Sequence, residues 1–179
     1  MGVGVRYIWA VLAVTMSVSV LTSCSEECTD NKNALPLAGF YSSETPAEKV
    51  SVSGLEVYGL GAPNDSILSP GSETKGEVYL PFRIDSDTTA YVFRYSYTEA
   101  GDSIPKVMAD TVTFVYSRTP RFVNVECGVS YNFGIRDIVT KGELIDSVTC
   151  PMGYIDNADI ENLRIYFAPN PATEPENPE

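Results

Sequence analysis

Tyr91-Val92-Phe93-Arg94-Tyr95-Ser96-Tyr97 is the stretch that says most about the fold, because aromatic residues occupy every second position. In an extended strand successive side chains point to opposite faces, so the four aromatic side chains would share one face. The other face carries Arg94 and Ser96 and is better suited to water. We therefore expect the aromatic face to pack in the core of a sheet. A row facing solvent would instead offer a platform for sugar rings or a protein partner.

Shorter stretches with the same alternation occur between residues 34 and 168. The clearest are 55–58, 78–82, 112–116 and 163–167, and further candidates are 35–42, 90–98, 122–127, 129–139 and 144–150. No window of a dozen residues has a helical stripe of apolar side chains. About eight or nine short strands joined by tight turns predict an all-β fold, an antiparallel β-sandwich of the immunoglobulin-like kind. A small β-barrel is the alternative.

Residues typical of turns separate these stretches. They occur at 62–65, 85–87, 99–102, 118–120 and 141–142. The last of these turns predicts a hairpin in which 129–139 pairs with 144–150. Pro81 lies inside the stretch 78–82, and because proline cannot donate a hydrogen bond to a sheet, that strand should lie at an edge or contain a bulge.

The composition divides the chain into four segments. Residues 1–23 are predicted to be a lipoprotein signal peptide, 24–33 an acidic tether, 34–168 the β-sandwich domain and 169–179 a disordered tail rich in proline and glutamate. The tail has no apolar periodicity, so it has no side chains with which to build a core. Without residues 1–23 the chain is long enough for one domain with a sizeable core.

The anchor is predicted from Leu21-Thr22-Ser23-Cys24, which follows a short apolar run at residues 8–21. This run is about 14 residues long, which fits the core of a signal peptide and is too short to span a bilayer. Leu-Thr-Ser-Cys resembles a lipobox, in which the cysteine sulfur is acylated and the chain is cut before it. We therefore expect a lipid on Cys24 that attaches the protein to the membrane, with an ordinary signal peptide as the alternative.

The acidic residues after Cys24 bear on the location. Ser25-Glu26-Glu27 resembles the short tag that directs lipoproteins of the Bacteroidota to the outer face of the outer membrane. We therefore predict a lipid-anchored protein of the outer membrane, exposed at the cell surface. A solvated acidic tether without an address is the alternative.

The mature chain is strongly acidic. The whole sequence carries a net charge of −12, and removing residues 1–23 takes away only Arg6, which leaves −13. Nucleic acids and anionic headgroups both require a positive face. The charge therefore argues against nucleic acid as a partner, and solubility at a crowded surface explains it.

The residues needed for common enzyme chemistry are missing. The sequence contains no histidine, which removes the usual general base and zinc ligand, and it has neither a glycine-rich phosphate loop nor a Gly-x-Ser-x-Gly elbow. A pair of carboxylates is the route left to a histidine-free enzyme, but the required spacing cannot be read from sequence. We predict a protein that is not an enzyme and that uses no cofactor.

Two loops gather acidic residues that could bind calcium. One contains Asp85 and Asp87, and the other contains Asp156 and Asp159. Calcium takes six to eight oxygen ligands, and neither loop has the spacing or the distal glutamate of an EF-hand. Aspartate in a turn commonly accepts hydrogen bonds from its own backbone. We therefore favour turn formation and predict no metal site.

Export would permit disulfides, and with Cys24 acylated three thiols remain: Cys28, Cys127 and Cys150. In the predicted hairpin, Cys127 lies roughly 20 Å along its strand from the residue opposite Cys150, whereas disulfide Cα atoms are about 5.5 Å apart. The pair Cys127–Cys150 is therefore disfavoured. We predict a Cys28–Cys127 disulfide, while a Cys28–Cys150 pair across two sheets stays open.

Several short motifs also carry a resemblance to a known family. They are Cys24 and Cys28, the segment 55–61, the stretch 118–128 and the ending 163–167. Together they resemble an uncharacterised lipoprotein family of the Bacteroidota, known only as domain of unknown function 6452. The resemblance implies that Cys28 and the pair Cys127-Gly128 recur in the family, which agrees with the predicted disulfide and leaves Cys150 as an extra thiol. It implies no activity.

Two classes of function remain open. A non-enzymatic surface module would bind a glycan, a peptide or a neighbouring outer-membrane protein, and should expose an apolar or aromatic patch. A structural or accessory lipoprotein without a small ligand should have an evenly polar surface and no pocket of ligand size. A calcium-binding β-domain is a further alternative.

Overall fold

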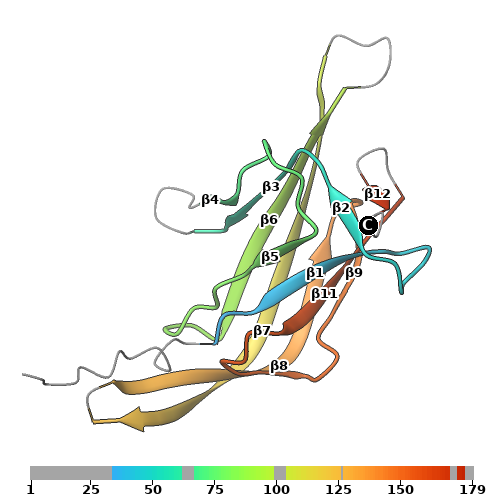
Figure 1. The fold of residues 1–179 in the computed structure, drawn as a ribbon. Helices are drawn as coiled ribbons and strands as arrows, with labels where there is room; N and C mark the ends of the chain where they lie inside the picture. Colours follow the sequence, from blue (N-terminus) through green and yellow to red (C-terminus); the bar gives the residue numbers. More distant parts are fainter. Residues whose placement is uncertain (1–33, 62–66, 99–103, 126, 170–172, 176–179) are drawn as a thin grey trace, which may run out of the picture.

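A computed structural model of the chain describes residues 34–61, 67–98, 104–125, 127–169 and 173–175. In these ranges the chain forms strands and turns, and no helix is present. The strands build two main sheets that pack face to face across a buried core (Figure 1). The predicted β-sandwich is confirmed, and the described residues form no closed barrel.

The larger sheet has six strands in the order β10-β8-β7-β6-β3-β4, and all its neighbours are antiparallel. Its strands are β3 (Leu55–Gly59), β4 (Ile67–Ser69), β6 (Thr88–Tyr97), β7 (Lys106–Asn124), β8 (Gly128–Lys141) and β10 (Tyr154–Ile155). Its two edge strands are short, three residues in β4 and two in β10.

The smaller sheet has four strands in the order β5-β1-β11-β9. These are β1 (Leu37–Ser42), β5 (Glu77–Tyr79), β9 (Ile145–Thr149) and β11 (Glu161–Phe167). β1 and β11 run parallel, so the expectation of a purely antiparallel sandwich is wrong for this pair. The two strands are separated by more than a hundred residues, so no tight turn forces them to run antiparallel.

A third, two-stranded sheet pairs β2 (Val50–Val52) with β12 (Thr173–Pro175). β12 lies in the segment 169–179 that we expected to be disordered, so that expectation does not hold for these three residues. The described residues contain twelve strands rather than eight or nine, because the unpredicted strands β2, β4, β10 and β12 have only two or three residues each, while the stretches 112–116 and 122–127 both belong to β7. Such short strands leave almost no alternation to detect in a sequence.

The aromatic strand packs as predicted. In β6, Tyr91, Phe93 and Tyr95 are buried, whereas Arg94 and Ser96 on the opposite face are exposed. Tyr97 is partly exposed at the end of the row, where its ring stacks on Tyr95. The row is therefore core, and it offers no platform to sugars.

Phe82 links the two sheets through aromatic contacts. Its ring centre lies 5.1 Å from that of Phe114, 4.7 Å from that of Tyr116 and 5.3 Å from that of Phe133. Phe82 follows β5 rather than lying in it, because β5 ends at Tyr79. β5 forms one edge of its sheet, but Pro81 lies outside this strand, so the edge or bulge predicted for a strand containing Pro81 does not apply.

The turn predicted at 118–120 does not form. β7 instead runs straight through these residues, and Pro120 pairs with Tyr131 of β8. β6 pairs with β7 only as far as Val115, so β6 no longer accompanies β7 at Pro120. A proline there removes no hydrogen bond to a neighbouring strand, which explains why it is tolerated.

The hairpin predicted around 141–142 is also wrong. β8 belongs to the six-stranded sheet and β9 to the four-stranded sheet, so the chain crosses from one sheet to the other between Lys141 and Ile145. The Cys127-to-Cys150 separation that we inferred from that hairpin therefore has no basis in the fold.

Asp110 on β7 holds this crossing in place. Its side chain is only 1 % exposed, and its carboxylate accepts hydrogen bonds from the backbone N–H groups of Glu143 at 3.0 Å, Leu144 at 2.9 Å and Ile145 at 2.7 Å. Gly142 leads into the crossing with a φ of 139°, and a Cβ atom there would lie 1.9 Å from Oδ1 of Asp110. The carboxylate therefore takes the place of a strand partner for three amides.

Candidate functional site

The candidate site is a groove where an edge of each sheet meets. β4 ends the six-stranded sheet and β5 ends the four-stranded sheet. The smaller of two pockets, of about 430 Å³, lies between them, and the larger, of about 500 Å³, lies beside it at the start of β6; both are lined by Leu68 and Pro81. We call these two adjoining pockets the edge groove.

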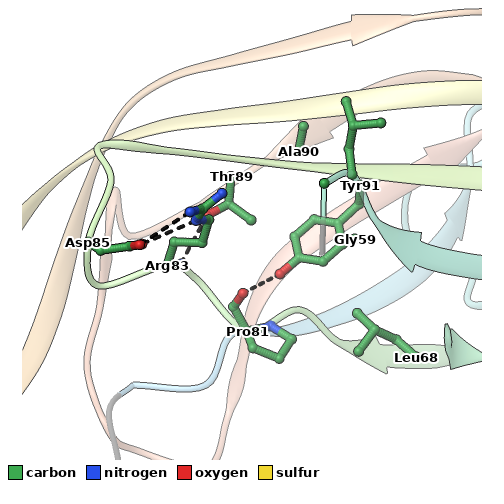
Figure 2. A pocket seen from close by; sticks show the side chains of 10 residues that line it. Gly59, Leu68, Pro81, Arg83, Asp85, Thr89, Ala90 and Tyr91 are labelled. Atoms are coloured by element: carbon green, nitrogen blue, oxygen red, sulfur yellow. Dashed lines mark hydrogen bonds and ion pairs between the residues drawn. The ribbon is translucent and has the colours of Figure 1, made fainter. Parts of the chain in front are cut away.

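The larger pocket is mainly apolar with one charged end. Its apolar lining comes from Leu60, Leu68, Pro81, Ala90 and Tyr91, and its polar lining comes from Arg83, Asp85 and Thr89. Figure 2 shows the Tyr91 ring and Leu68 at one end and the pair Arg83–Asp85 at the other. Such a lining suits a ligand with an apolar body.

The charged end is a two-point ion pair. Arg83 donates from Nε to Oδ1 of Asp85 at 3.1 Å and from Nη2 to Oδ2 at 3.2 Å. The hydrogen bonds and charge of Arg83 lower the pKa of Asp85, and the same contacts raise the pKa of Arg83. Asp85 is therefore ionised at neutral pH and cannot serve as a general acid there.

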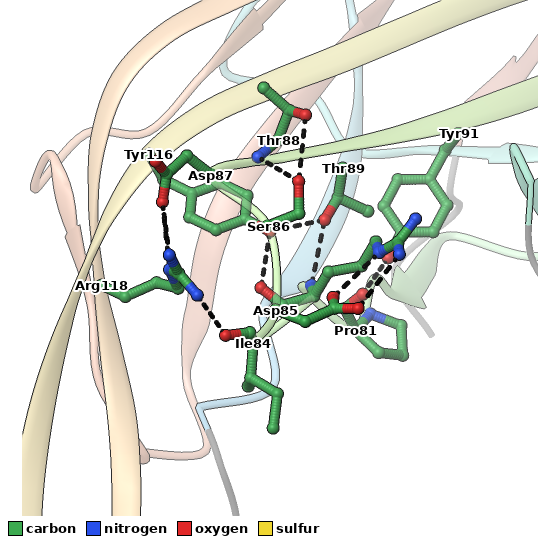
Figure 3. Close-up of polar contacts among 11 residues, drawn as sticks. Pro81, Ile84, Asp85, Ser86, Asp87, Thr88, Thr89, Tyr91, Tyr116 and Arg118 are labelled. Carbon is green, nitrogen blue, oxygen red and sulfur yellow. Dashed lines mark hydrogen bonds and ion pairs between the residues drawn. The ribbon is translucent and has the colours of Figure 1, made fainter.

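Three polar groups close a ring of hydrogen bonds behind the groove (Figure 3). The backbone N–H of Arg83 donates to Oγ1 of Thr89 at 3.0 Å, and the hydroxyl of Tyr116 donates to the carbonyl of Arg83 at 2.8 Å. The Thr89 hydroxyl lies 2.6 Å from that of Tyr116, whose proton is already donated, so Thr89 is the donor. Burial raises the pKa of Tyr116, which keeps its donor proton in place.

Tyr91 fastens the preceding residues in a similar way. Its hydroxyl donates to the carbonyl of Pro81. Burial raises the pKa of Tyr91 far above its ordinary value, so the phenol stays protonated. The wall that carries Pro81 and Arg83 is thus tied to β6 and β7, and the groove is preformed.

The first pair of calcium candidates is used in ion pairs. Asp85 binds Arg83, while Asp87 accepts from Nε of Arg118 at 3.0 Å and lies 2.9 Å from its Nη2. Arg118 also donates to the carbonyl of Ile84. The structure therefore places each of these carboxylates against an arginine, a neighbour that repels cations.

The second pair of candidates serves turns and strands. Asp156 accepts from the backbone N–H of Ala158 at 3.0 Å, and Asp159 accepts from the hydroxyl of Tyr79 at 2.9 Å. Within the ranges that the structure describes, no three His, Cys, Asp or Glu side chains come together in a way that could hold a metal ion.

A polar cluster on the outer face of the smaller sheet was missed by sequence reasoning. Glu161 accepts from the hydroxyl of Tyr41 at 2.7 Å and from Nε of Arg164 at 3.0 Å, and it lies 3.2 Å from Nζ of Lys49. Gly39 makes room for it, because a Cβ atom at that position would lie 2.3 Å from Oε2 of Glu161. A glycine inside an alternating strand was the signal that could have pointed to this close approach.

These contacts shift the pKa values of two groups in opposite directions. Burial, followed by the hydrogen bond to Glu161, raises the pKa of Tyr41 to about 12. Burial alone would raise the pKa of Glu161, but hydrogen bonds from Tyr41, Lys49 and Arg164 outweigh it and lower the value. The cluster links β1 to β11, and its charged side chains form ion pairs with one another.

The cysteine predictions fall largely outside the described residues. Cys24 and Cys28 lie in that undescribed part, so lipidation at Cys24 and the Cys28–Cys127 disulfide stay predictions. Cys127 is buried, and Cys150 is a free, half-buried thiol whose pKa is raised by burial. Because Cys150 is free, neither of the two pairings that would use it is formed here.

Comparisons with known proteins place the chain in one family. No curated protein matches the chain, and no solved structure matches it. Among the described residues, no helix has the length and apolarity to cross a membrane. The model of a family of unknown function, DUF6452, matches residues 54–167, which is more than half of the sequence. On this match, the chain belongs to the DUF6452 family.

Proposed function

We propose that this protein is an outer-membrane lipoprotein, held by a lipid on Cys24, whose domain binds a protein partner and catalyses no reaction. The binding role is carried by one observation, the preformed edge groove, whose larger pocket has a mainly apolar lining. The anchor is carried by the lipobox-like Leu21-Thr22-Ser23-Cys24 at the end of a signal-like segment. The location rests on Ser25-Glu26-Glu27 and on the resemblance to lipoproteins of the Bacteroidota.

The groove favours an extended peptide over a glycan. Glycan recognition commonly uses exposed aromatic faces, and the aromatic row of β6 is buried. The groove instead presents the apolar side chains of Leu60, Leu68 and Pro81, and its smaller pocket is bounded by two edge strands, β4 and β5. An extended segment can place side chains in such pockets while its backbone lies beside an edge strand. We therefore propose an apolar segment of a neighbouring envelope protein as the ligand.

A non-catalytic role agrees with the charges of the groove. The two charged side chains of its larger pocket, Arg83 and Asp85, bind each other. Asp85 has a lowered pKa, which is the opposite of what a carboxylic acid needs to donate a proton at neutral pH. The whole sequence also contains no histidine that could act as the proton donor.

The Cys28–Cys127 disulfide is part of the same proposal. The backbone N–H of Ala34 donates to the carbonyl of Tyr131 on β8 at 3.2 Å. Cys28 precedes Ala34 by six residues, about 20 Å of extended chain, and Cys127 precedes Tyr131 by four residues, about 13 Å. A tether that runs back along β8 therefore reaches Cys127.

The anchor is tested by metabolic labelling with a fatty-acid analogue. The native protein should take up the label, and Cys24→Ser should not. Cys150→Ser is the matched control and should be labelled like the native protein. A labelled Cys24→Ser protein would contradict the lipoprotein assignment. Treating whole cells with an impermeant protease tests exposure, because a surface protein is digested and one facing the periplasm is protected.

The groove is tested with peptide and glycan arrays probed by the unlipidated Cys24→Ser mature chain. Leu60→Asp places a charge at an exposed position of the groove, and Val107→Asp places the same charge at an exposed position of β7 outside its lining. We expect peptide binding that Leu60→Asp abolishes and Val107→Asp preserves. Binding to glycans alone, unaffected by Leu60→Asp, would refute the assignment of the ligand class.

A further inference from the structure

β7 and β8 continue beyond the sandwich as a two-stranded ribbon. β6 accompanies β7 only to Val115, and β10 covers β8 only at Phe133 and Gly134. Past these points β7 and β8 pair only with each other among the named strands, and Figure 1 shows them projecting from one end of the molecule. We call residues 117–132 the arm.

The end of the arm exposes apolar side chains. Phe122 is 66 % exposed, Val125 is 91 % exposed and Val129 is 48 % exposed. Phe122 and Val129 are cross-strand partners, and Val125 lies in the turn just beyond them, so the three form one cap. A two-stranded ribbon in water would normally carry polar residues at its tip. The exposed apolar surface of the cap therefore favours an apolar environment.

The charge of the arm differs from that of the rest of the chain. The arm contains two arginines, Arg118 and Arg121, and one acidic residue, Glu126. The mature chain has 24 acidic residues in total, so almost all of its negative charge lies elsewhere. The arm is thus the part of this acidic protein that a lipid surface would repel least.

The start of the described chain connects the arm to the predicted lipid. Ala34 donates its backbone N–H to the carbonyl of Tyr131, which lies in the arm opposite Pro120. Ten residues separate Cys24 from Ala34, and they span at most about 34 Å. The tip lies about 20 Å or less along the arm from Tyr131. A lipid on Cys24 therefore keeps the cap within reach of the same bilayer.

We propose that the cap formed by Phe122, Val125 and Val129 inserts into the boundary between headgroups and acyl chains of the membrane that holds the lipid. This inference rests on the proposed anchor at Cys24. The lipid makes the second contact intramolecular, so even a weak insertion becomes highly populated. With two points of attachment the domain has a fixed orientation on the membrane.

Depth-dependent quenching tests this insertion in the lipidated mature protein. The only tryptophan of the sequence, Trp9, lies in residues 1–23, so one introduced tryptophan reports alone. In vesicles with brominated acyl chains, we expect the fluorescence of Phe122→Trp to fall at least about two-fold relative to unbrominated vesicles. Val107→Trp, at a 52 % exposed position near the other end of β7, should not change.

The two proposals fail in different ways in this experiment. Mass spectrometry reports whether Cys24 carries lipid, so an unmodified mass contradicts the anchor without reference to quenching. A lipidated protein whose Phe122→Trp signal is no more quenched than that of Val107→Trp overturns insertion of the cap.

A second measurement needs no lipid on the protein. In the unlipidated Cys24→Ser chain, the double change Phe122→Ser with Val125→Ser should weaken vesicle partitioning about ten-fold, and Val107→Ser should leave it unchanged. Equal partitioning of all three proteins would overturn the proposal. The proposal would also be overturned if sedimentation detected a dimer that the double substitution dissociates, because a second copy would then cover the cap.

Discussion

Two connections between the sheets are held by aspartates in opposite ways. The crossing from β8 to β9 surrounds the buried Asp110, whose carboxylate accepts three backbone N–H groups. The connection from β5 to β6 passes Asp85 and Asp87, which are solvent-exposed and paired with arginines. An aspartate side chain is therefore part of the core at one connection, and aspartate side chains are part of the surface at the other.

The difference teaches where the stability of such connections comes from. A buried amide that loses its acceptor keeps the full penalty of desolvation, about 1 to 3 kcal/mol. An exposed ion pair exchanges its partner for water at little loss. The connection around Asp85 is instead held from behind by the hydroxyls of Tyr116 and Tyr91. Each prediction below alters one side of this comparison.

Asp110→Ala should have the largest effect. It leaves three amides without an acceptor, so we expect a loss of about 3 to 5 kcal/mol in the free energy of unfolding. Urea denaturation measures the loss, and Asp137→Ala, an exposed aspartate on β8, is the control and should change little. A loss below about 1 kcal/mol for Asp110→Ala would show that water replaces the carboxylate.

Gly142→Ala probes the same crossing from the other side. A methyl group at this position meets Oδ1 of Asp110 at 1.9 Å, and φ is 139°, so we expect a loss of about 2 to 3 kcal/mol. Gly153→Ala is the matched control, because Gly153 also has a positive φ, of 65°, but nothing lies within 4 Å of its added Cβ. Its loss should be only about 1 kcal/mol. Equal losses would mean that backbone strain alone decides, and that the contact with Asp110 does not matter.

Glu161 gives an intermediate, pH-dependent effect. Its pKa is lowered in the folded state, so its contribution is fully present above the unfolded value near 4.5 and is lost as the pH falls through the lower folded value. Thermal unfolding between about pH 3 and pH 6 should therefore show the native protein losing its advantage over Glu161→Gln in acid. A constant difference across this range would contradict the shift.

The same cluster predicts a loss at the alkaline end. The pKa of Tyr41 is raised to about 12, so the stabilisation from its protonated hydroxyl is present below pH 10 and is lost between about pH 10 and pH 12. Tyr41→Phe should show a shallower decline over that range.

Asp85→Asn should have the smallest effect. Both partners of its ion pair are exposed, and we expect no measurable change in melting temperature. Adding millimolar calcium should also leave the melting temperature of the native protein unchanged. A calcium-dependent rise in the melting temperature that Asp85→Asn removes would instead support a calcium site at Asp85 and Asp87.

Sequence patterns correctly predicted a feature that depends on residues close together in the chain. The alternation in β6 was enough to identify the buried aromatic face. The turn at 118–120 was wrong because a proline is compatible with a strand whose neighbour has ended, and the length of β6 cannot be read from the sequence around Pro120.

The other errors arise from partners that are distant in sequence. The residues around Gly142 look like a hairpin turn, but Asp110, more than thirty residues earlier, takes their amides and redirects the chain to the other sheet. Tyr41 and Glu161 are 120 residues apart, so no pattern within either strand announces their contact. The edge groove likewise combines Leu68, Pro81 and Tyr91 from separate segments.

The parallel pairing of β1 with β11 also sets an order of events as the chain is synthesised. β1 lies between β5 and β11, so the smaller sheet cannot close until the strand that ends at Phe167 has emerged. Such long-range pairing forms slowly, because the chain loses the entropy of closing a long loop before the stabilising contacts form. A chain that emerges from its N-terminus would therefore keep its smaller sheet open until its last long strand has appeared.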